Sequence, residues 1–361
     1  MSNRADGLNY APKGKAQPVV EKGAFVFAAT ALDHGHINGM CNGLSEAGGV
    51  LKWVYDRNQK AAEALAAKFP GAKIARSEQE ILDDTAVHLV AGAAVPAHRC
   101  ALGLRVMDAG KDYFTDKTPL TSLEQLEQAK AKVKETGKKY NVYYSERLHV
   151  ESAIYAGNLI ADGAIGKVLQ VTGLGPHRLS APTRPDWFWS KSETGGILCD
   201  IGSHQIEQFL FYSGATDAEV KYGRVANFGN PDHPEFEDFG EASLIGNNGT
   251  SDYFRVDWFT PDGLGVWGDG RLFILGTEGY IEQRKYIDVA RSSAGSQLFV
   301  VDHGKERHID CNNTVGYPYF GQLILDCLNR TENAMTQEHA FKAVELCVKA
   351  QMLADVERKN V

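Results

Sequence analysis

The chain has 361 residues, of which 43% are hydrophobic and 23% are charged, and its formal net charge is −8. A chain of this length exceeds what one hydrophobic core usually supports, so two domains are expected. The acidic balance argues against nucleic acid or an anionic membrane as the main partner, and no segment offers the ~18 uninterrupted apolar residues of a membrane span.

The first 23 residues are polar and lack the apolar centre of a signal peptide. We expect residues 1–23 to form a flexible or partner-clasping arm. The six cysteines are scattered without a C-x-x-C pair, which favours reduced thiols in a cytoplasmic protein over a zinc site.

Residues 24–146 alternate short apolar runs with longer helix-like segments. Ser77 followed by Glu80 is typical of a capping box at the start of a helix. Strands are expected at residues 24–30, 50–56, 86–94, 111–117 and 138–146, and helices at 37–48, 57–70, 77–84, 97–110 and 121–137. This alternation with short connections predicts an α/β domain of the Rossmann type, with a doubly wound parallel sheet.

Residues 147–361 follow a different rhythm, in which aromatic-rich runs are separated by Gly and Asn turns. Strands are expected at residues 167–178, 219–229, 240–247, 251–259, 271–286 and 297–304, and helices near 149–163, 195–213, 319–330 and 337–359. The pattern predicts an α+β domain with a large, mostly antiparallel sheet. The C-terminal helix could pack back on the first domain.

The turn after the first strand reads Ala-Leu-Asp-His-Gly-His-Ile, residues 31–37. Its position predicts a pyrophosphate site at a helix N-terminus, although the G-x-G-x-x-G fingerprint is missing. Gly35 would let the backbone approach the pyrophosphate, Asp33 would cap the helix, and His34 and His36 would face the nucleotide. Two histidines and one aspartate from a single turn rarely converge on one ion, so no metal is expected.

Asp56 ends the second strand, ~20 residues beyond the turn, where an acidic residue commonly meets the adenosine ribose of NAD. An aspartate there is also favoured by turns alone. Arg57 could instead accept a 2′-phosphate, so the sequence leaves NADP open beside NAD.

Two further constellations could carry chemistry. Lys117 stands at the C-terminal end of the strand at 111–117, the edge where open α/β sheets bind ligands, unless it is a solvated surface lysine. Asp200 and His204 are four residues apart and would share one helix face, as a general acid/base pair or as an internal hydrogen bond. Gly195, Gly196 and Gly202 beside them favour the close approach of another group.

Taken together, "VYDRNQKAAEALAAKF", "MDAGKDYFTDKTPL" and "GGILCDIGSHQ" resemble the glucose–fructose oxidoreductase/inositol dehydrogenase/rhizopine-catabolism (Gfo/Idh/MocA) family, and the resemblance covers the chain from about residue 24. It implies catalytic roles for Lys117, Asp200 and His204, with His204 removing a hydroxyl proton as hydride leaves the same carbon. It also implies a homo-oligomer, a dimer, tetramer or larger, formed through the second domain's sheet. Thr118 departs from the family's Glu-Lys-Pro turn.

The residues expected to bind the cofactor, NAD with NADP not excluded, are Ala31, Asp33, His34, Gly35, His36, Ile37, Asp56, Arg57, Ala94, Pro96, His98 and Lys117. The residues expected to bind a sugar, glycoside or cyclic polyol are Arg147, His149, His177, Arg178, Arg184, Trp187, Asp200 and His204. The function we expect from the sequence is that of an NAD(P)-dependent oxidoreductase. Alternatives are a glycoside-cleaving enzyme that keeps NAD bound for transient oxidation, and a non-catalytic nucleotide-binding sensor.

Overall fold

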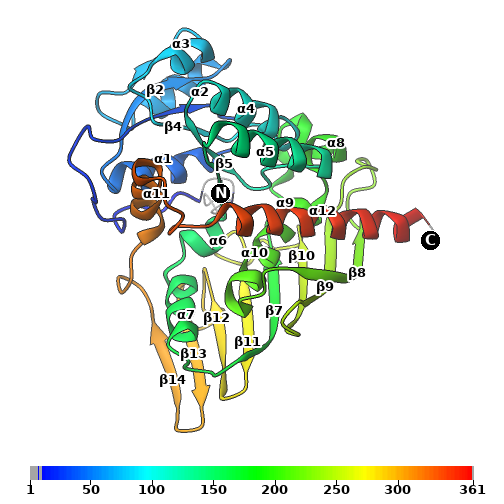
Figure 1. Cartoon of the computed structure of the whole chain (residues 1–361). Coiled ribbons are helices and arrows are strands. Elements are labelled where there is room, and N and C mark those ends of the chain that lie inside the picture. The colour runs from blue at the N-terminus through cyan, green and yellow to red at the C-terminus, as the bar shows by residue number, and fades with distance from the viewer. Residues whose placement is uncertain (1–6, 8–9, 360–361) are drawn as a thin grey trace. The chain divides into compact units, whose positions relative to one another are not determined.

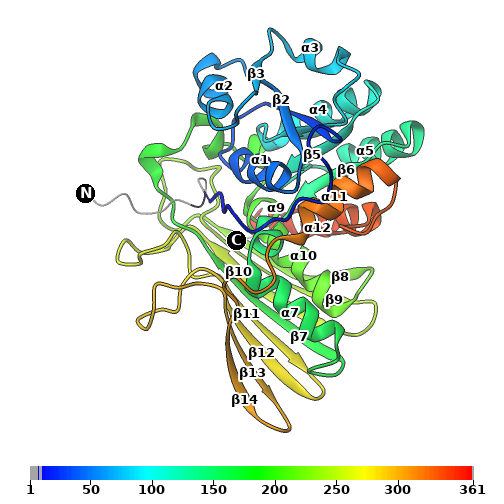
Figure 2. The same ribbon diagram turned by 90° about the vertical axis from the view of Figure 1, so that its left-hand side faces the viewer.

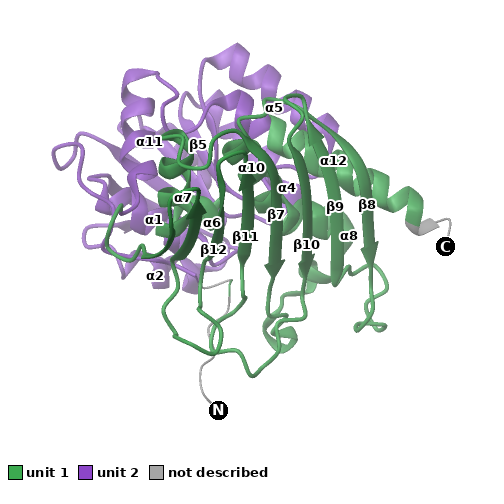
Figure 3. Ribbon diagram, turned by 90° about the horizontal axis from the view of Figure 1, so that it is seen from below, with its two compact units in different colours: residues 1–7, 144–315, 342–361 green, residues 8–143, 316–341 purple. Residues whose placement is uncertain are grey.

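The computed structural model describes residue 7 and residues 10–359, and residue contacts divide the chain into two units. Unit 1 comprises residues 1–7, 144–315 and 342–361, and unit 2 comprises residues 8–143 and 316–341 (Figures 1 and 3). Residues 316–341 thus group with the N-terminal half, whereas the sequence pattern assigned everything after residue 146 to the second domain. No helix in the described part of the chain is long and apolar enough to cross a membrane.

Unit 2 is built on a six-stranded, wholly parallel sheet in the order β3-β2-β1-β4-β5-β6. Its strands are β1 (Val26–Thr30), β2 (Val50–Tyr55), β3 (Lys73–Ile74), β4 (Leu89–Gly92), β5 (Asp112–Asp116) and β6 (Tyr140–Tyr143). Its helices are α1 (Ile37–Glu46), α2 (Gln59–Ala66), α3 (Glu78–Asp83), α4 (Pro96–Asp108), α5 (Leu123–Thr136) and α11 (Pro318–Asn329). The predicted doubly wound sheet is confirmed.

The strand order of unit 2 reverses at β1, so right-handed connections place α1 and α4 on opposite faces of the sheet. Helix α11 packs beside α1 because Gly43 leaves room for an aromatic ring: a Cβ at Gly43 would lie 2.4 Å from the ring of Phe320. This close approach explains why a segment far along the chain belongs to unit 2. Half of the expected capping box is present: the Ser77 hydroxyl accepts a hydrogen bond from Glu80 N, while the Glu80 carboxylate accepts one from Arg76 N.

Residues 1–6 and 8–9 of the expected N-terminal arm lie outside the described residues. The rest of the arm runs along α1 and α11. The Glu46 carboxylate accepts a hydrogen bond from Gly14 N at 2.6 Å, Val19 N donates to Ala47 O, and Tyr317 N donates to Lys15 O. Hydrogen bonds at Gly14, Lys15 and Val19 therefore hold this part of the arm in unit 2.

Unit 1 is built on an eight-stranded sheet in the order β14-β13-β12-β11-β7-β10-β9-β8, antiparallel except for the β7–β10 pair. Its strands are β7 (Val168–Pro176), β8 (Ala218–Ala226), β9 (Phe239–Gly246), β10 (Ser251–Asp257), β11 (Arg271–Gly276), β12 (Gly279–Arg284), β13 (Gln297–Asp302) and β14 (Glu306–Asp310). The predicted mostly antiparallel sheet is confirmed, with the run at 271–286 forming a hairpin of two strands.

One face of this sheet is covered by α7 (Glu151–Ala161) and α10 (Gly202–Ser213), which pack on β7, β9, β10 and β12 (Figure 2). The last helix, α12 (Gln337–Lys359), contacts β8 at Gly223. The shorter helices are α6 (Ser145–Leu148), η2 (Ala181–Thr183), η3 (Asp186–Trp189), α8 (Lys191–Thr194) and α9 (Ile197–Asp200). The expected single helix at 195–213 is thus two helices, α9 and α10, divided at Ile201.

Candidate active site

A cavity of ≈ 580 Å³ opens at the carboxyl ends of β1, β2 and β4 in unit 2. Six of the residues predicted to bind the cofactor line it: Ala31, Asp33, Asp56, Arg57, Ala94 and His98. His34, Gly35, His36, Ile37, Pro96 and Lys117 are not among its lining residues. The carboxyl edge of a doubly wound sheet, where the strand order reverses, is the usual ligand site of such folds.

The turn after β1 does not use Asp33 as a helix cap, contrary to the expectation. The N-cap of α1 is His36, which makes no capping side-chain bond, while Asp33 accepts a hydrogen bond from the backbone N–H of Val95. Ala31 takes the left-handed conformation, φ 52°, that a glycine adopts more readily. The turn is therefore glycine-like in its backbone although alanine occupies the position.

Two carboxylates lie close together in the cavity. Asp56 accepts hydrogen bonds from Leu32 N at 2.6 Å and from Asn58 N at 2.7 Å, which fixes its side chain beside the turn. Burial, and then the neighbouring Asp56 carboxylate, raise the pKa of Asp33. Two carboxylates therefore line the cavity where an adenosine ribose is expected, with Arg57 beside them.

Lys117 directly follows β5 and is only 4% exposed. The peptide bond between Lys117 and Thr118 is cis. The preceding Asp116 is fully buried and accepts hydrogen bonds from both turn histidines, with 3.0 Å separating its carboxylate oxygens from His34 Nδ1 and from His36 Nδ1. Sequence reasoning missed Asp116, although its place beside Lys117 at a strand end was a usable signal.

His34, His36 and Asp116 together have the composition of a metal site. The carboxylate of Asp116 is already occupied, however, since Lys117 N and Arg99 Nη2 also donate to it. A carboxylate has about four lone-pair sites, and these four donors use them. A cation would also have to lie beside the Arg99 guanidinium, so the geometry favours a hydrogen-bonded cluster over an ion site.

In unit 1, the segment around α9 and α10 brings predicted catalytic groups together. Asp200 ends α9 and is partly exposed, while His204 lies in the first turn of α10 and is 1% exposed. The backbone between them is tied by hydrogen bonds from Ser203 Oγ to Asp200 O and from His204 N to Ile201 O. The two residues are thus held on consecutive short helices rather than on one continuous helix face.

A buried charge cluster adjoins α10, and sequence reasoning missed it. Glu146 Oε2 accepts hydrogen bonds from Lys285 Nζ at 2.6 Å and Gln205 Nε2 at 3.2 Å, and its Oε1 lies 3.9 Å from His177 Nε2. Burial would raise the pKa of Glu146, but Lys285, His204 and His177 together hold it well below its usual range. Glu146 is therefore an ionised carboxylate in the protein interior. No sequence signal identified Lys285, which follows a strand 139 residues away.

The expected substrate arginines have internal partners. Arg147 Nε donates to Glu207 at 2.7 Å, and its guanidinium lies 4.0 Å from the centroid of the Phe211 ring. Arg178 donates to the carbonyls of Pro261 and Leu264. His149 is fully buried at the end of α6. The contacts of Arg147 therefore stabilise the position of α6, and those of Arg178 stabilise the loop that contains Pro261 and Leu264.

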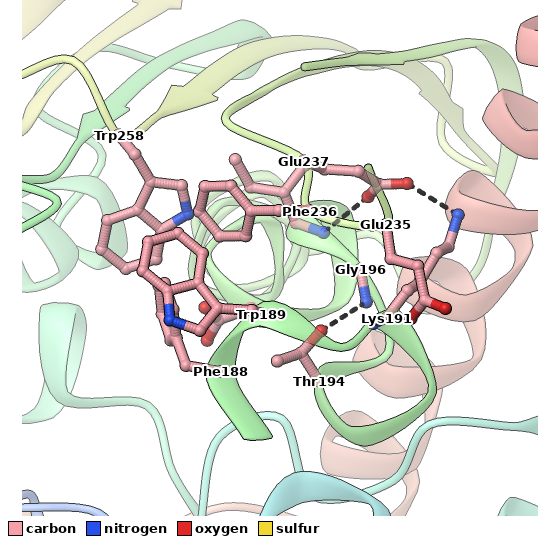
Figure 4. A pocket seen from close by; sticks show the side chains of 11 residues that line it. Phe188, Trp189, Lys191, Thr194, Gly196, Glu235, Phe236, Glu237 and Trp258 are labelled. Atoms are coloured by element: carbon pink, nitrogen blue, oxygen red, sulfur yellow. Dashed lines mark hydrogen bonds and ion pairs between the residues drawn. The ribbon is translucent and has the colours of Figure 1, made fainter. Parts of the chain in front are cut away.

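Aromatic rings line one side of a small pocket (Figure 4), and Asp200 is among the residues that line it. Trp189, Phe188 and Trp258 gather on one side, and the Arg184 guanidinium lies 4.6 Å and 4.9 Å from the ring centroids of Phe188 and Trp258. Trp187 precedes Phe188 in the same 3₁₀ turn and is partly exposed. The pocket offers an aromatic wall beside a carboxylate.

Across this pocket, Glu237 accepts hydrogen bonds from Lys191 Nζ at 2.6 Å and from Ile197 N at 2.9 Å (Figure 4). The second bond satisfies a free N–H at the start of α9. Glu237 therefore fixes the short helix that ends in Asp200.

A six-stranded parallel sheet in this order, with an acidic residue fixed at the end of its second strand and a cavity at its carboxyl edge, defines a dinucleotide-binding protein. Residues 31–144 match the profile of the "Oxidoreductase family, NAD-binding Rossmann fold", and residues 154–282 match that of the "GFO/IDH/MocA C-terminal domain". The chain belongs to the GFO/IDH/MocA oxidoreductase family, and unit 2 carries its NAD-binding fold.

The chain is similar to a solved structure from Erwinia carotovora atroseptica that is designated in general terms as an oxidoreductase: 49% identity, TM-score 0.89, covering 91% of this chain and 98% of that one. It is 27% identical to scyllo-inositol 2-dehydrogenase (NAD(+)) of Bacillus subtilis, over 65% of this chain and 66% of that protein. It is 25% identical to D-xylose dehydrogenase of Paenarthrobacter nicotinovorans, over 41% of this chain and 39% of that protein. The chain thus matches less than two thirds of the length of these two dehydrogenases.

Proposed function

We propose that this protein is an NAD(P)-dependent oxidoreductase that moves a hydride between nicotinamide and the carbon of a secondary hydroxyl in a sugar, glycoside or cyclic polyol. The observation that carries the proposal is Lys117, a lysine only 4% exposed that stands at the carboxyl end of a strand in the NAD-binding unit. Lys111 and Lys139 of the same unit are buried to a similar extent, so it is the place of Lys117 that supports a catalytic role: the carboxyl end of a parallel strand is where doubly wound folds bind their ligands.

The residues of the unit 2 cavity fit a dinucleotide. Asp56 would accept hydrogen bonds from the adenosine ribose, and the backbone after Ala31 would meet the pyrophosphate. The nicotinamide supplies the hydride acceptor, a function that no side chain provides. Asp33 and Asp56 both line the cavity and would repel a 2′-phosphate, whereas Arg57 beside them would attract it; since two carboxylates face one guanidinium, we expect NAD to be preferred over NADP.

In the proposed reaction, His204 takes the proton of the substrate hydroxyl and Lys117 donates a hydrogen bond to the same oxygen. The C–H electron pair then leaves the carbon as hydride, and the C–O bond becomes a carbonyl. Asp200 accepts a hydrogen bond from a neighbouring hydroxyl. The ionised Glu146 favours the protonated form of the base, because an opposite charge nearby stabilises an imidazolium.

A polyhydroxylated substrate is supported by the chemistry of unit 1. Asp200 is partly exposed at the aromatic pocket, and its carboxylate can accept hydrogen bonds from substrate hydroxyls. Trp187 and His177 would border the same substrate. The two dehydrogenase relatives, named for xylose and scyllo-inositol, act on substrates of this class.

A homo-oligomer formed through the sheet of unit 1 is part of the proposal. The face opposite α7 and α10 carries apolar side chains that are 36–42% exposed, among them Tyr253 on β10 and Phe273 and Leu275 on β11, the two strands that flank β7. A contiguous exposed apolar patch commonly marks a protein–protein interface. A cytoplasmic location is proposed from the six cysteines, all of which are buried free thiols.

The test is a panel of aldoses, inositols and glycosides with NAD and with NADP, followed at 340 nm. Steady accumulation of NADH with one class of substrate supports the dehydrogenase. Release of an aglycone without accumulation would instead support redox-neutral cleavage with bound NAD. Binding of NAD without either reaction across the panel would favour the sensor.

A further inference from the structure

The carboxylate of Asp116 joins three segments of unit 2. Its Oδ1 accepts hydrogen bonds from His36 Nδ1 at 3.0 Å and from Lys117 N at 2.8 Å. Its Oδ2 lies 3.0 Å from His34 Nδ1 and 3.3 Å from Arg99 Nη2. The turn after β1, the first turn of α4 and the residue after β5 therefore meet on one side chain that is fully buried.

Arg99 completes this arrangement from the opposite side of the Lys117 backbone. It is 1% exposed and donates from Nη1 to the carbonyls of Lys117 and Thr118, and from Nε to Ala94 O at 2.6 Å. The backbone of Lys117 is thus held at its N–H by Asp116 and at its C=O by Arg99. Fixing both ends of one residue fixes the direction in which its side chain leaves the backbone.

The charges of the cluster keep it intact over the working pH range. Burial would raise the pKa of Asp116, but His36, Arg99 and His34 hold it well below its usual range, so the carboxylate stays ionised. Burial, and then His36, lower the pKa of His34 to about 3. His34 is therefore neutral near pH 7 and donates to Asp116 through Nδ1–H, with the tautomer assigned from this contact.

We propose that Asp116, Arg99, His34 and His36 are positioning residues for Lys117, and that they couple the cofactor turn to it. The inference rests on the proposed function, in which Lys117 binds the reacting hydroxyl. It accounts for the histidines in a turn where glycines were expected: they reach from the cofactor turn to the carboxylate that holds the lysine. A displacement of ~1 Å at a reacting group can lower a rate by ~10²-fold, so such a device can control kcat.

The test compares matched variants. His36→Asn keeps an N–H donor near the position of Nδ1, whereas His36→Leu removes it. Arg99→Lys keeps the charge but cannot span two carbonyls. We expect His36→Leu and Arg99→Lys to lower kcat by ~10–10²-fold, with KM for the alcohol changed by less than ~3-fold and with His36→Asn close to wild type. Arg76→Met, which removes an exposed ion pair in the same unit, is the control.

A double-mutant cycle separates positioning from general damage. If Arg99 acts through Lys117, Arg99→Lys has no further effect on kcat once Lys117 is replaced by Met. Equal losses of kcat in both backgrounds would overturn the proposal, as would wild-type kcat in both Arg99→Lys and His36→Leu.

A readout independent of turnover distinguishes this inference from the proposed function. The rate of reductive methylation of Lys117, measured by peptide mass spectrometry, should change in Arg99→Lys and His36→Leu but not in His36→Asn or Arg76→Met. An unchanged methylation rate in the first two variants would refute positioning. If the wild-type protein oxidises no alcohol, but the methylation rate of Lys117 still changes in Arg99→Lys and His36→Leu, the proposed function is refuted and the positioning of Lys117 is not.

Discussion

Glu146→Gln tests the electrostatics of the reacting base most sharply, because it removes one buried negative charge with little change of shape. The carboxylate lies 3.9 Å from His177 Nε2 and is held ionised by Lys285, His204 and His177. His204, the proposed base, acts on the same carboxylate more strongly than His177 does, so the ~4 kcal/mol of one charge pair at the His177 separation and an effective dielectric of ~20 also sets the scale for His204. Lys285, 2.6 Å from the same carboxylate, cancels much of this field.

We therefore expect the net effect to be about one pH unit, equivalent to ~1.4 kcal/mol. The sign follows from the charge: losing the carboxylate disfavours the protonated imidazole, so the acid limb of the kcat/KM profile for alcohol oxidation moves to lower pH. The plateau rate should fall, because the base becomes weaker. The measurement is the initial rate of NADH formation between pH 5 and pH 10.

Two controls accompany this variant. Glu146→Gln leaves the fully buried Lys285 without its partner, a change that commonly costs about 3–5 kcal/mol, so thermal unfolding must be followed in parallel. The double variant Glu146→Gln/Lys285→Met removes both charges. It should regain the thermal stability lost in Glu146→Gln, but its kcat/KM–pH profile should stay different from that of the wild type. An acid limb that stays in place in a folded Glu146→Gln protein would refute the assigned role of Glu146.

The remaining predictions concern single residues. His204→Ala and Lys117→Ala should each lower kcat by ~10²–10⁴-fold with the Kd for NAD little changed, measured by steady-state kinetics and NADH fluorescence; unchanged turnover in either would remove that residue from the mechanism. Asp56→Ser should narrow the preference for NAD over NADP in kcat/KM, and a preference that stays constant would show that Asp56 does not meet the ribose. Tyr253→Glu on the open sheet face should lower the mass seen by light scattering, and an unchanged mass would place the interface elsewhere. Burial raises the pKa of Asp252 well above its usual range, so the folded state loses stability relative to the unfolded state as the pH rises above the pKa of Asp252 in the unfolded chain. Asp252→Asn should therefore raise Tm at pH 7, and the increase should become smaller toward pH 4.

The architecture was predictable because hydrophobic periodicity reports burial directly. The alternation over residues 24–146 predicted every strand of the parallel sheet except the two-residue β3. Strand β14 (Glu306–Asp310) was not predicted from the sequence either. It is an edge strand whose side chains are mostly exposed, so it lacks the apolar pattern of a core strand. Edge strands are specified by their partner more than by their own sequence.

The site was less predictable than the fold, because its chemistry depends on residues far apart in the chain. Glu146 and Lys285 form one ion pair across 139 residues, and nothing in either local sequence shows the other. Arg99 lies in an ordinary helical stretch, and only the structure shows its side chain bracketing the backbone of Lys117. The turn histidines were recognised as unusual, but their partner, Asp116, lies 80 residues beyond His36.

The most direct test of the central claim is to follow the hydride itself. The enzyme would be given NAD and a sugar or inositol deuterated at its hydroxyl-bearing carbons, and the reduced cofactor would be weighed by mass spectrometry. The account predicts that the wild type forms NADH carrying one deuterium, and that Lys117→Ala and His204→Ala form it far more slowly. Consumption of the substrate without deuterium reaching the nicotinamide would contradict it.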